Sequence, residues 1–194
     1  MPIGPEPNDW WSATAAEFLA VPEFQDRRWV HVQKVGAKAE LIAPALGDEG
    51  ELLVAAAWLH DIGYSRLLAR TMFHPIDGAE ELLRRGVEPR LAALVAHHSG
   101  AALEATLRDL DVDMRQFTDE EGPVRDALWT CDMTTSPVGR PVSFNERLME
   151  IKQRYGEEHT VPRAIEAAGD EIRACICRTR ERAHAAGIAI DLEV

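Results

Sequence analysis

Residues 52–64 read LLVAAAWLHDIGY, and this stretch decides the fold. Its first eight residues are apolar on every side of a helix, which is typical of a helix surrounded by other helices. The run is too short to cross a bilayer, which needs about 20 apolar residues. Two polar residues, His60 and Asp61, follow at once, and Gly63 predicts a left-handed cap. We therefore expect a central helix over 51–60 that ends in two chemically active side chains.

Helix-like patterns continue on both sides of this stretch, and no segment alternates with the period of a strand. Glycine and proline clusters separate the patterns and mark the loops between them. The sequence therefore predicts an all-α, single-domain helical bundle. The further predicted helices cover 9–21, part of 23–46, 75–85, 88–98, 101–113, 120–133, 144–155 and 162–186.

Length and charge narrow the function classes. The chain has 194 residues, the size of one domain, and a net charge of -12. Such a charge argues against bulk nucleic acid and anionic membranes as partners, because both attract basic surfaces. Three cysteines and no secretory pattern at the N-terminus favour free thiols and a cytoplasmic location. Cys175 and Cys177 are interpreted as thiols of a helix rather than as a metal site.

Five of the seven histidines fall within residues 31–98. Asp132 ends another apolar helical stripe, where a carboxylate needs a partner. One buried histidine is commonly satisfied by a hydrogen bond, but five together with two inward acids favour metal binding. Imidazole and carboxylate ligands suit first-row divalent metals, and the two oxygens of Asp61 could bridge two ions. The five histidines are His31, His60, His74, His97 and His98.

The order of these residues resembles the HD-domain superfamily of metal-dependent phosphohydrolases, in its six-ligand branch with two metals. LHDIG is similar to the signature helix of that superfamily. Four further motifs carry the resemblance, which covers residues 23 to about 155: RRWVHVQKV (27–35), FHPIDGAEELL (73–83), LVAHHSG (94–100) and ALWTCDM (127–133).

The resemblance implies a ligand set and a division of the chain. It implies a first metal on His31, His60, Asp61 and Asp132, and a second metal on His74 and His97 with Asp61 as the bridge. Helical periodicity puts His98 on the inner face, so the choice between His97 and His98 stays open. The division is an N-terminal extension over 1–22, the metal-binding core over 23–155 and a C-terminal helix over 156–194.

The implied activity is hydrolysis of a phosphoester or phosphoanhydride in a small nucleotide-like substrate by metal-activated hydroxide. The implied cofactors are one or two divalent transition metals, iron or manganese first, with zinc, cobalt, nickel or magnesium as alternatives. The expected partner is a small phosphorylated molecule rather than bulk nucleic acid or membrane, and a homodimer stays open. The expected catalytic residues are His60, Asp61 and His98, with Arg28, Arg66 and Tyr64 toward the phosphate and Lys34 and Arg147 as further candidates.

Two other activities stay open from the sequence. Some members of the superfamily hold two irons on the same six ligands and oxidise a small molecule with dioxygen. A third interpretation is a non-catalytic module that binds a nucleotide. Tyr64 stands where many two-metal members carry lysine, and the layout around the paired histidines is closer to enzymes that split dinucleoside tetraphosphates than to cyclic-dinucleotide phosphodiesterases.

Overall fold

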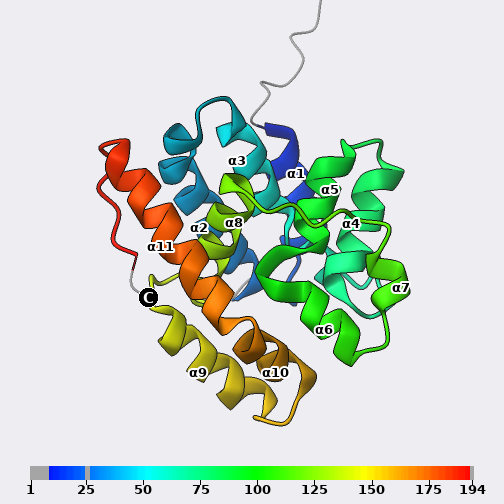
Figure 1. The fold of residues 1–194 in the computed structure, drawn as a ribbon. Helices are drawn as coiled ribbons and strands as arrows, with labels where there is room; N and C mark the ends of the chain where they lie inside the picture. The colour runs from blue at the N-terminus through cyan, green and yellow to red at the C-terminus, as the bar shows by residue number, and fades with distance from the viewer. Residues whose placement is uncertain (1–8, 25–26, 193–194) are drawn as a thin grey trace, which may run out of the picture.

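A computed structural model describes residues 9–24 and 27–192, and these residues form a helical bundle (Figure 1). Within them, the β-type pairing consists of one isolated bridge between Thr135 and Pro141. The prediction of an all-α fold is confirmed. The helices are α1 (Asp9–Leu19), α2 (Arg28–Ile42), η1 (Ala43–Glu49), α3 (Gly50–Leu59), η2 (Ile62–Tyr64), α4 (His74–Arg84), α5 (Pro89–Ala96), η3 (His98–Gly100), α6 (Ala101–Leu107), α7 (Asp111–Met114), α8 (Pro123–Met133), α9 (Phe144–Tyr155), α10 (Thr160–Ala167) and α11 (Gly169–Ala185).

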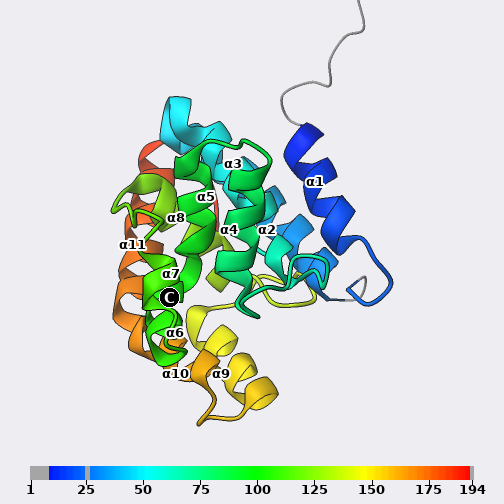
Figure 2. The same ribbon diagram turned by 90° about the vertical axis from the view of Figure 1, so that its right-hand side faces the viewer.

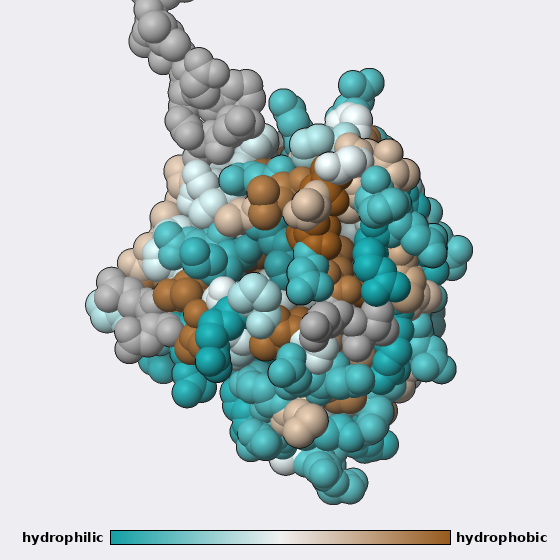
Figure 3. Space-filling model, turned by 90° about the vertical axis from the view of Figure 1, so that its left-hand side faces the viewer, coloured by the Kyte–Doolittle hydropathy of each residue, from teal (hydrophilic) through white to brown (hydrophobic). Residues whose placement is uncertain are grey.

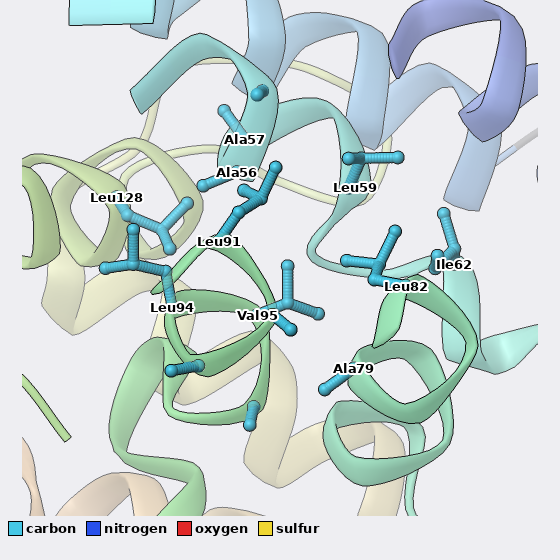
Figure 4. Close-up of a cluster of buried hydrophobic side chains, with 14 of the residues drawn as sticks. Ala56, Ala57, Leu59, Ile62, Ala79, Leu82, Leu91, Leu94, Val95 and Leu128 are labelled. Atoms are coloured by element: carbon cyan, nitrogen blue, oxygen red, sulfur yellow. The ribbon is translucent and has the colours of Figure 1, made fainter. Parts of the chain in front are cut away.

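Helix α3 lies in the middle of the bundle and packs against α1, α2, α5 and α8. Its residues Leu53, Ala56 and Leu59 are fully buried. Figure 4 shows Leu94 and Val95 of α5 in the same apolar cluster as Ala56. A helix packed against four others holds its C-terminal end in a fixed place, and His60 and Asp61 come directly after that end.

Local sequence signals explain where several helices begin. Pro75, Pro89 and Pro123 occupy the first turns of α4, α5 and α8, where the missing N–H of proline costs no helical hydrogen bond. Ser143 begins α9 with a capping box, in which its hydroxyl accepts from the Glu146 N–H while the Glu146 carboxylate accepts from the Ser143 N–H. These signals fix the residues at which α4, α5, α8 and α9 begin.

The structure divides two of the predicted helices. The helix expected over 162–186 is two helices, because α10 packs against α6 and α9 while α11 follows α8. The helix expected over 101–113 breaks at Asp109, whose φ of 59° is left-handed, and continues as α7. In Figures 1 and 2, α9 and α10 lie together at the lower end of the molecule. Tertiary packing therefore overrides the continuous helical pattern in both segments.

The prediction of a left-handed cap at Gly63 is wrong. Gly63 lies inside η2 without a positive φ. A Cβ atom at this position would lie 2.0 Å from the His74 carbonyl oxygen and 2.6 Å from the Gly78 nitrogen. Glycine is needed here because η2 and the start of α4 approach each other closely, which brings Asp61 next to His74.

The surface agrees with the charged composition. Figure 3 shows one face that is mostly hydrophilic, with a narrow band of hydrophobic residues across its upper half. None of the helices in the described part of the chain combines the length and the apolarity needed to span a membrane.

Candidate metal centre

Side chains that can bind metals converge where α2, α3, α4, η3 and α8 meet. There are six such side chains. Five of them are buried, and the sixth, that of His74, is 17% exposed. They come from segments far apart in the sequence, so only the fold brings them together. In chain order they are His31, His60, Asp61, His74, His98 and Asp132.

The two carboxylate oxygens of Asp61 face different histidine pairs. Oδ2 lies 3.3 Å from His60 Nε2 and 3.9 Å from His31 Nε2. Oδ1 lies 3.4 Å from His74 Nε2 and 3.9 Å from His98 Nε2. Each set offers ligand atoms that lie within 4.8 Å of one another, close enough to hold one metal ion. One carboxylate between two such sets could bridge two ions.

Backbone carbonyls orient three of the histidines. Nδ1 of His60 lies 2.8 Å from the Ala57 carbonyl oxygen, and Nδ1 of His98 lies 2.6 Å from the Val95 carbonyl oxygen. His31 Nδ1 lies 3.2 Å from the carbonyl oxygen of Ser136. A proton on each Nδ1 satisfies these contacts and leaves the Nε2 lone pairs facing the cluster. Metal-binding histidines are commonly held by such an outer hydrogen bond.

The inner nitrogens of the histidines fit a cation. His60 Nε2 is buried and makes no hydrogen bond, although Asp61 Oδ2 is its neighbour. The Nε2 atoms of His74 and His98 face each other at 3.2 Å. Two lone pairs in such contact repel unless a proton or a metal ion lies between them. A buried polar atom without a partner costs about 1–3 kcal/mol, so the donor set fits divalent metal ions.

Asp132 completes the first histidine set. Its Oδ1 lies 3.0 Å from His31 Nε2 and 3.9 Å from His60 Nε2. Its Oδ2 accepts a hydrogen bond from the hydroxyl of Ser99, a residue with a left-handed φ of 51°. This contact ties α8 to the turn that carries His98.

Most protonation states here suit metal binding. The exception is His60: burial lowers its pKa, but the Asp61 carboxylate outweighs this and raises it, so the ring would release a proton when a metal binds. Burial lowers the pKa of His31, His74 and His98, so these rings are neutral near pH 7. Burial would raise the pKa of Asp61, but the charges of Arg28 and His60 hold it well below its usual value. Neutral imidazoles and ionised carboxylates are the forms that bind metals.

Arg28 and Tyr64 form one wall of the cluster. Arg28 Nη1 donates a hydrogen bond to Asp61 Oδ2, and its guanidinium lies 3.6 Å above the centre of the Tyr64 ring. The Tyr64 ring also stacks on His74, with ring centres 3.9 Å apart. Tyr64 therefore packs between the two side chains and positions them.

Two of the predicted site residues lie elsewhere. His97 Nε2 lies 3.0 Å from the Phe117 carbonyl oxygen, outside the cluster. Helix α5 ends at Ala96, and the turn that follows directs His98 inward, so His98 takes the position expected of His97. The side chain of Arg66 is 87% exposed, and its nearest charged partner is Glu23, so it does not face the cluster. Lys34 lines a separate groove near the C-terminal segment.

Helices α9 and α10 supply further residues at the cavity, of which the sequence analysis named Arg147 as a candidate and missed Arg154. Arg147 and Arg154 of α9 line a cavity of about 60 Å³ together with Asp61, His74, His98 and Asp132. About 10–15 Å³ of such space holds one water molecule, so the cavity admits a group of a few atoms. Arg147, Ile151 and Arg154 recur at helical spacing, and this pattern could have predicted one shared face. Apolar side chains complete the wall: Ile151, Val161, Ala164 and Ile165.

The HD domain family model matches residues 28–127 of the chain. This range includes five of the six clustered side chains and ends before Asp132, α9 and α10.

Two curated relatives match part of the chain. One is the tRNA (cytidine(56)-2'-O)-methyltransferase of Thermoplasma volcanium, 35% identical over 75 residues, which are 39% of this chain and 22% of the relative. The other is the enzyme of the same name from Picrophilus torridus, 34% identical over 73 residues, 38% of this chain and 21% of the relative. The chain thus spans about a fifth of the length of these relatives. No solved structure matches.

The relatives overturn one expectation from the sequence. Their names specify tRNA, so the prediction of a small-molecule partner with nucleic acid excluded is wrong. That prediction rested on the net charge of the whole chain. The net charge of the whole chain does not describe this cavity, where Arg28, Arg147 and Arg154 lie beside three acidic residues.

Proposed function

This chain belongs to the HD-domain family, and from that premise we propose that it is a metal-dependent hydrolase of a phosphoester or phosphoanhydride bond. The observation that carries the proposal is the placement of Asp61, with one oxygen toward His31 and His60 and the other toward His74 and His98. A carboxylate shared between two ligand sets could hold two ions side by side, and two neighbouring ions can clamp the oxygens of a phosphoryl displacement.

We assign the ligands from these contacts. His31, His60, Asp61 and Asp132 would hold one divalent ion. His74, His98 and Asp61 would hold the second, with His98 in place of His97. Nitrogen and carboxylate donors together suit iron or manganese, and zinc, cobalt or nickel fit the same donors.

The chemistry divides between the ions and the chain. Divalent ions held by these residues would lower the pKa of a bound water to about 7 and would neutralise phosphoryl oxygens. The backbone carbonyls behind His31, His60 and His98 hold each Nδ1 proton outward, so that each Nε2 stays free for binding. Arg28 stands beside Asp61, where its guanidinium can donate to an oxygen of the substrate phosphate.

The cavity supports a phosphoryl substrate. Three arginines line it, and guanidinium groups bind phosphate through paired N–H donors. A volume of about 60 Å³ admits a phosphoryl group while the rest of the substrate lies outside. The tRNA in the names of the relatives makes a phosphate on RNA a substrate to test beside free phosphoesters.

The main alternative is a diiron oxygenase on the same six ligands. The arginines favour the hydrolase, because a neutral substrate would leave Arg147 without a partner for its buried Nε. The two reactions differ in their need for dioxygen, which an assay under nitrogen tests directly.

The test is an assay of protein that is stripped with chelator and reloaded with Mn²⁺ or Fe²⁺. The substrates are p-nitrophenyl phosphate, bis(p-nitrophenyl) phosphate, pyrophosphate and a 5'-phosphorylated RNA. We expect release of phosphate or nitrophenol only in the reloaded protein, equally in air and under nitrogen. An Asp132→Asn variant should lose this activity, while Asp170→Asn, at an exposed carboxylate of α11, should keep it.

Inactivity of the fully loaded protein on every phosphorylated substrate would contradict the proposal. Activity that requires air would assign the site to the oxygenase.

A further inference from the structure

Two arginines at the candidate site have no role among the metal ligands. Arg147 and Arg154 belong to α9, beyond the range that matches the HD domain. Arg147 is 6% exposed, which is rare for a charged side chain without full pairing. The function proposed above uses them as general phosphate-binding donors and assigns neither of them to a particular phosphate.

The two arginines share one acid. Arg147 Nη1 donates to Glu150 Oε2 at 2.5 Å, and Arg154 Nε lies 3.5 Å from Glu150 Oε1. The Nε atoms of both arginines are buried and make no hydrogen bond in the described structure. The two guanidinium groups share Glu150, and each keeps a buried Nε–H donor that could bind an anion.

Arg147 and Arg154 lie between two cavities. Arg147 and Arg154 line the cavity that contains Asp61 and Asp132. They also line a neighbouring cavity of about 230 Å³ that contains Phe24. Because Arg28 and His31 also line this second cavity, an anion on the two arginines would lie next to the reacting phosphate.

We propose that Arg147 and Arg154 bind a second phosphate of the substrate, next to the phosphate that is hydrolysed. The inference rests on the proposed function, since it presupposes that a first phosphate lies at the metal ligands. It narrows the substrate to molecules with two neighbouring phosphates, either a phosphoanhydride or a phosphate followed by a phosphodiester.

Direct binding tests this subsite without turnover. Calorimetry would compare methylenediphosphonate, a non-hydrolysable compound with two phosphonates, with methylphosphonate, which has one. In metal-loaded protein we expect Arg147→Gln to weaken the diphosphonate about tenfold to a hundredfold, the value of one or two charge-assisted hydrogen bonds. Methylphosphonate affinity and metal content should change less than twofold.

The variants include their own controls. Arg154→Gln keeps the test valid if Arg147→Gln fails to fold, because the Arg154 side chain is 25% exposed and a change there is tolerated more easily. Arg147→Lys should restore part of the diphosphonate affinity. Arg163→Gln makes the same charge change at an exposed site of α10 and should leave both affinities unchanged.

Equal weakening of both phosphonates by Arg147→Gln and Arg154→Gln, or no weakening of either, would overturn the subsite. Kinetics with pyrophosphate and a 5'-phosphorylated dinucleotide then identify which kind of substrate supplies the second phosphate. In Arg154→Gln, kcat/KM for that substrate should fall because its KM rises. A parent that binds the diphosphonate through Arg147 but hydrolyses nothing would refute the proposed function and leave the subsite standing.

Discussion

At the scale of single residues, the two adjacent histidines differ in what they contact. His98 directs Nε2 toward Asp61, whereas His97 contacts a backbone carbonyl and its own carbonyl accepts from Trp129 Nε1. Helical spacing from Leu91 and Leu94 predicts His98 on the inner face, while the resemblance named His97. The physical pattern was the better guide, because the turn after Ala96 keeps the inward direction of the stripe.

The pair His98→Ala and His97→Ala tests this assignment. His98→Ala removes a proposed ligand of the second ion, so we expect about one equivalent of metal instead of two. His97→Ala should keep two equivalents, because its ring faces Phe117. Metal analysis after dialysis measures both. Retention of two ions by His98→Ala would reject the ligand assignment.

At the scale of helices, the close approach of η2 to α4 positions Asp61 between the two sets of histidines. The sequence predicts α3 and its polar end well, because apolar periodicity is a local property. It does not predict that η2 lies against the first turn of α4, since that contact depends on tertiary packing. The role of Gly63 was misjudged for the same reason.

Gly63→Ala tests this contact. The new Cβ would meet the His74 carbonyl oxygen at 2.0 Å, and backbone atoms cannot move aside cheaply. We expect a loss of about 3 kcal/mol in the free energy of unfolding, the upper range for overpacking. Urea denaturation measures the loss.

Gly122→Ala is the matched control, because nothing lies within 4 Å of its added Cβ and its φ of 169° is extended. We expect a change within about 0.5 kcal/mol for it. Similar stability of the two variants would show that the approach of η2 to α4 is not tight.

At the scale of the whole molecule, α8 and α11 are joined through a buried carboxylate. Asp126 accepts two hydrogen bonds of 2.8 Å from Arg178. Cys175 Sγ lies 3.3 Å from the same carboxylate, and Glu171 is close enough to complete a third metal-like group. Arg178 already pairs with both acids, so this group is an ion-pair network between helices.

The stability of the molecule should depend on pH through Asp126. Burial raises its pKa, but the hydrogen bonds from Arg178 outweigh this and lower the pKa below its usual value. A lowered folded-state pKa stabilises the protein above the unfolded-state pKa of about 4, and this stabilisation is lost as the pH falls through the folded-state pKa.

Asp126→Asn should therefore lower the free energy of unfolding by about 1–3 kcal/mol near pH 7, less than for a fully buried pair because Arg178 is partly exposed. The difference from the parent should shrink below about pH 4. Denaturant unfolding across pH measures it, with Asp170→Asn at the start of α11 as the exposed control. A difference that stays constant with pH would reject this source of stability.

The composition of the whole chain was a poor guide to the partner. The charge of -12 predicted that nucleic acid is excluded, yet the relatives are named for tRNA and the arginines of α2 and α9 gather at one cavity. Motif order predicted five of the six side chains that the structure brings together, because they lie on strongly periodic helices. Arg154 was missed because its position depends on how α9 packs at the lower end of the bundle.

The central claim is that Asp61 joins two metal ions, and metal analysis of Asp61→Ala tests it most directly. Protein purified without chelator should hold about two equivalents of divalent metal, and Asp61→Ala should hold close to none. Asp170→Ala should match the parent, and circular dichroism should show that all three proteins are folded. A folded Asp61→Ala protein that keeps two equivalents, or a parent that binds none at neutral pH, would contradict the account.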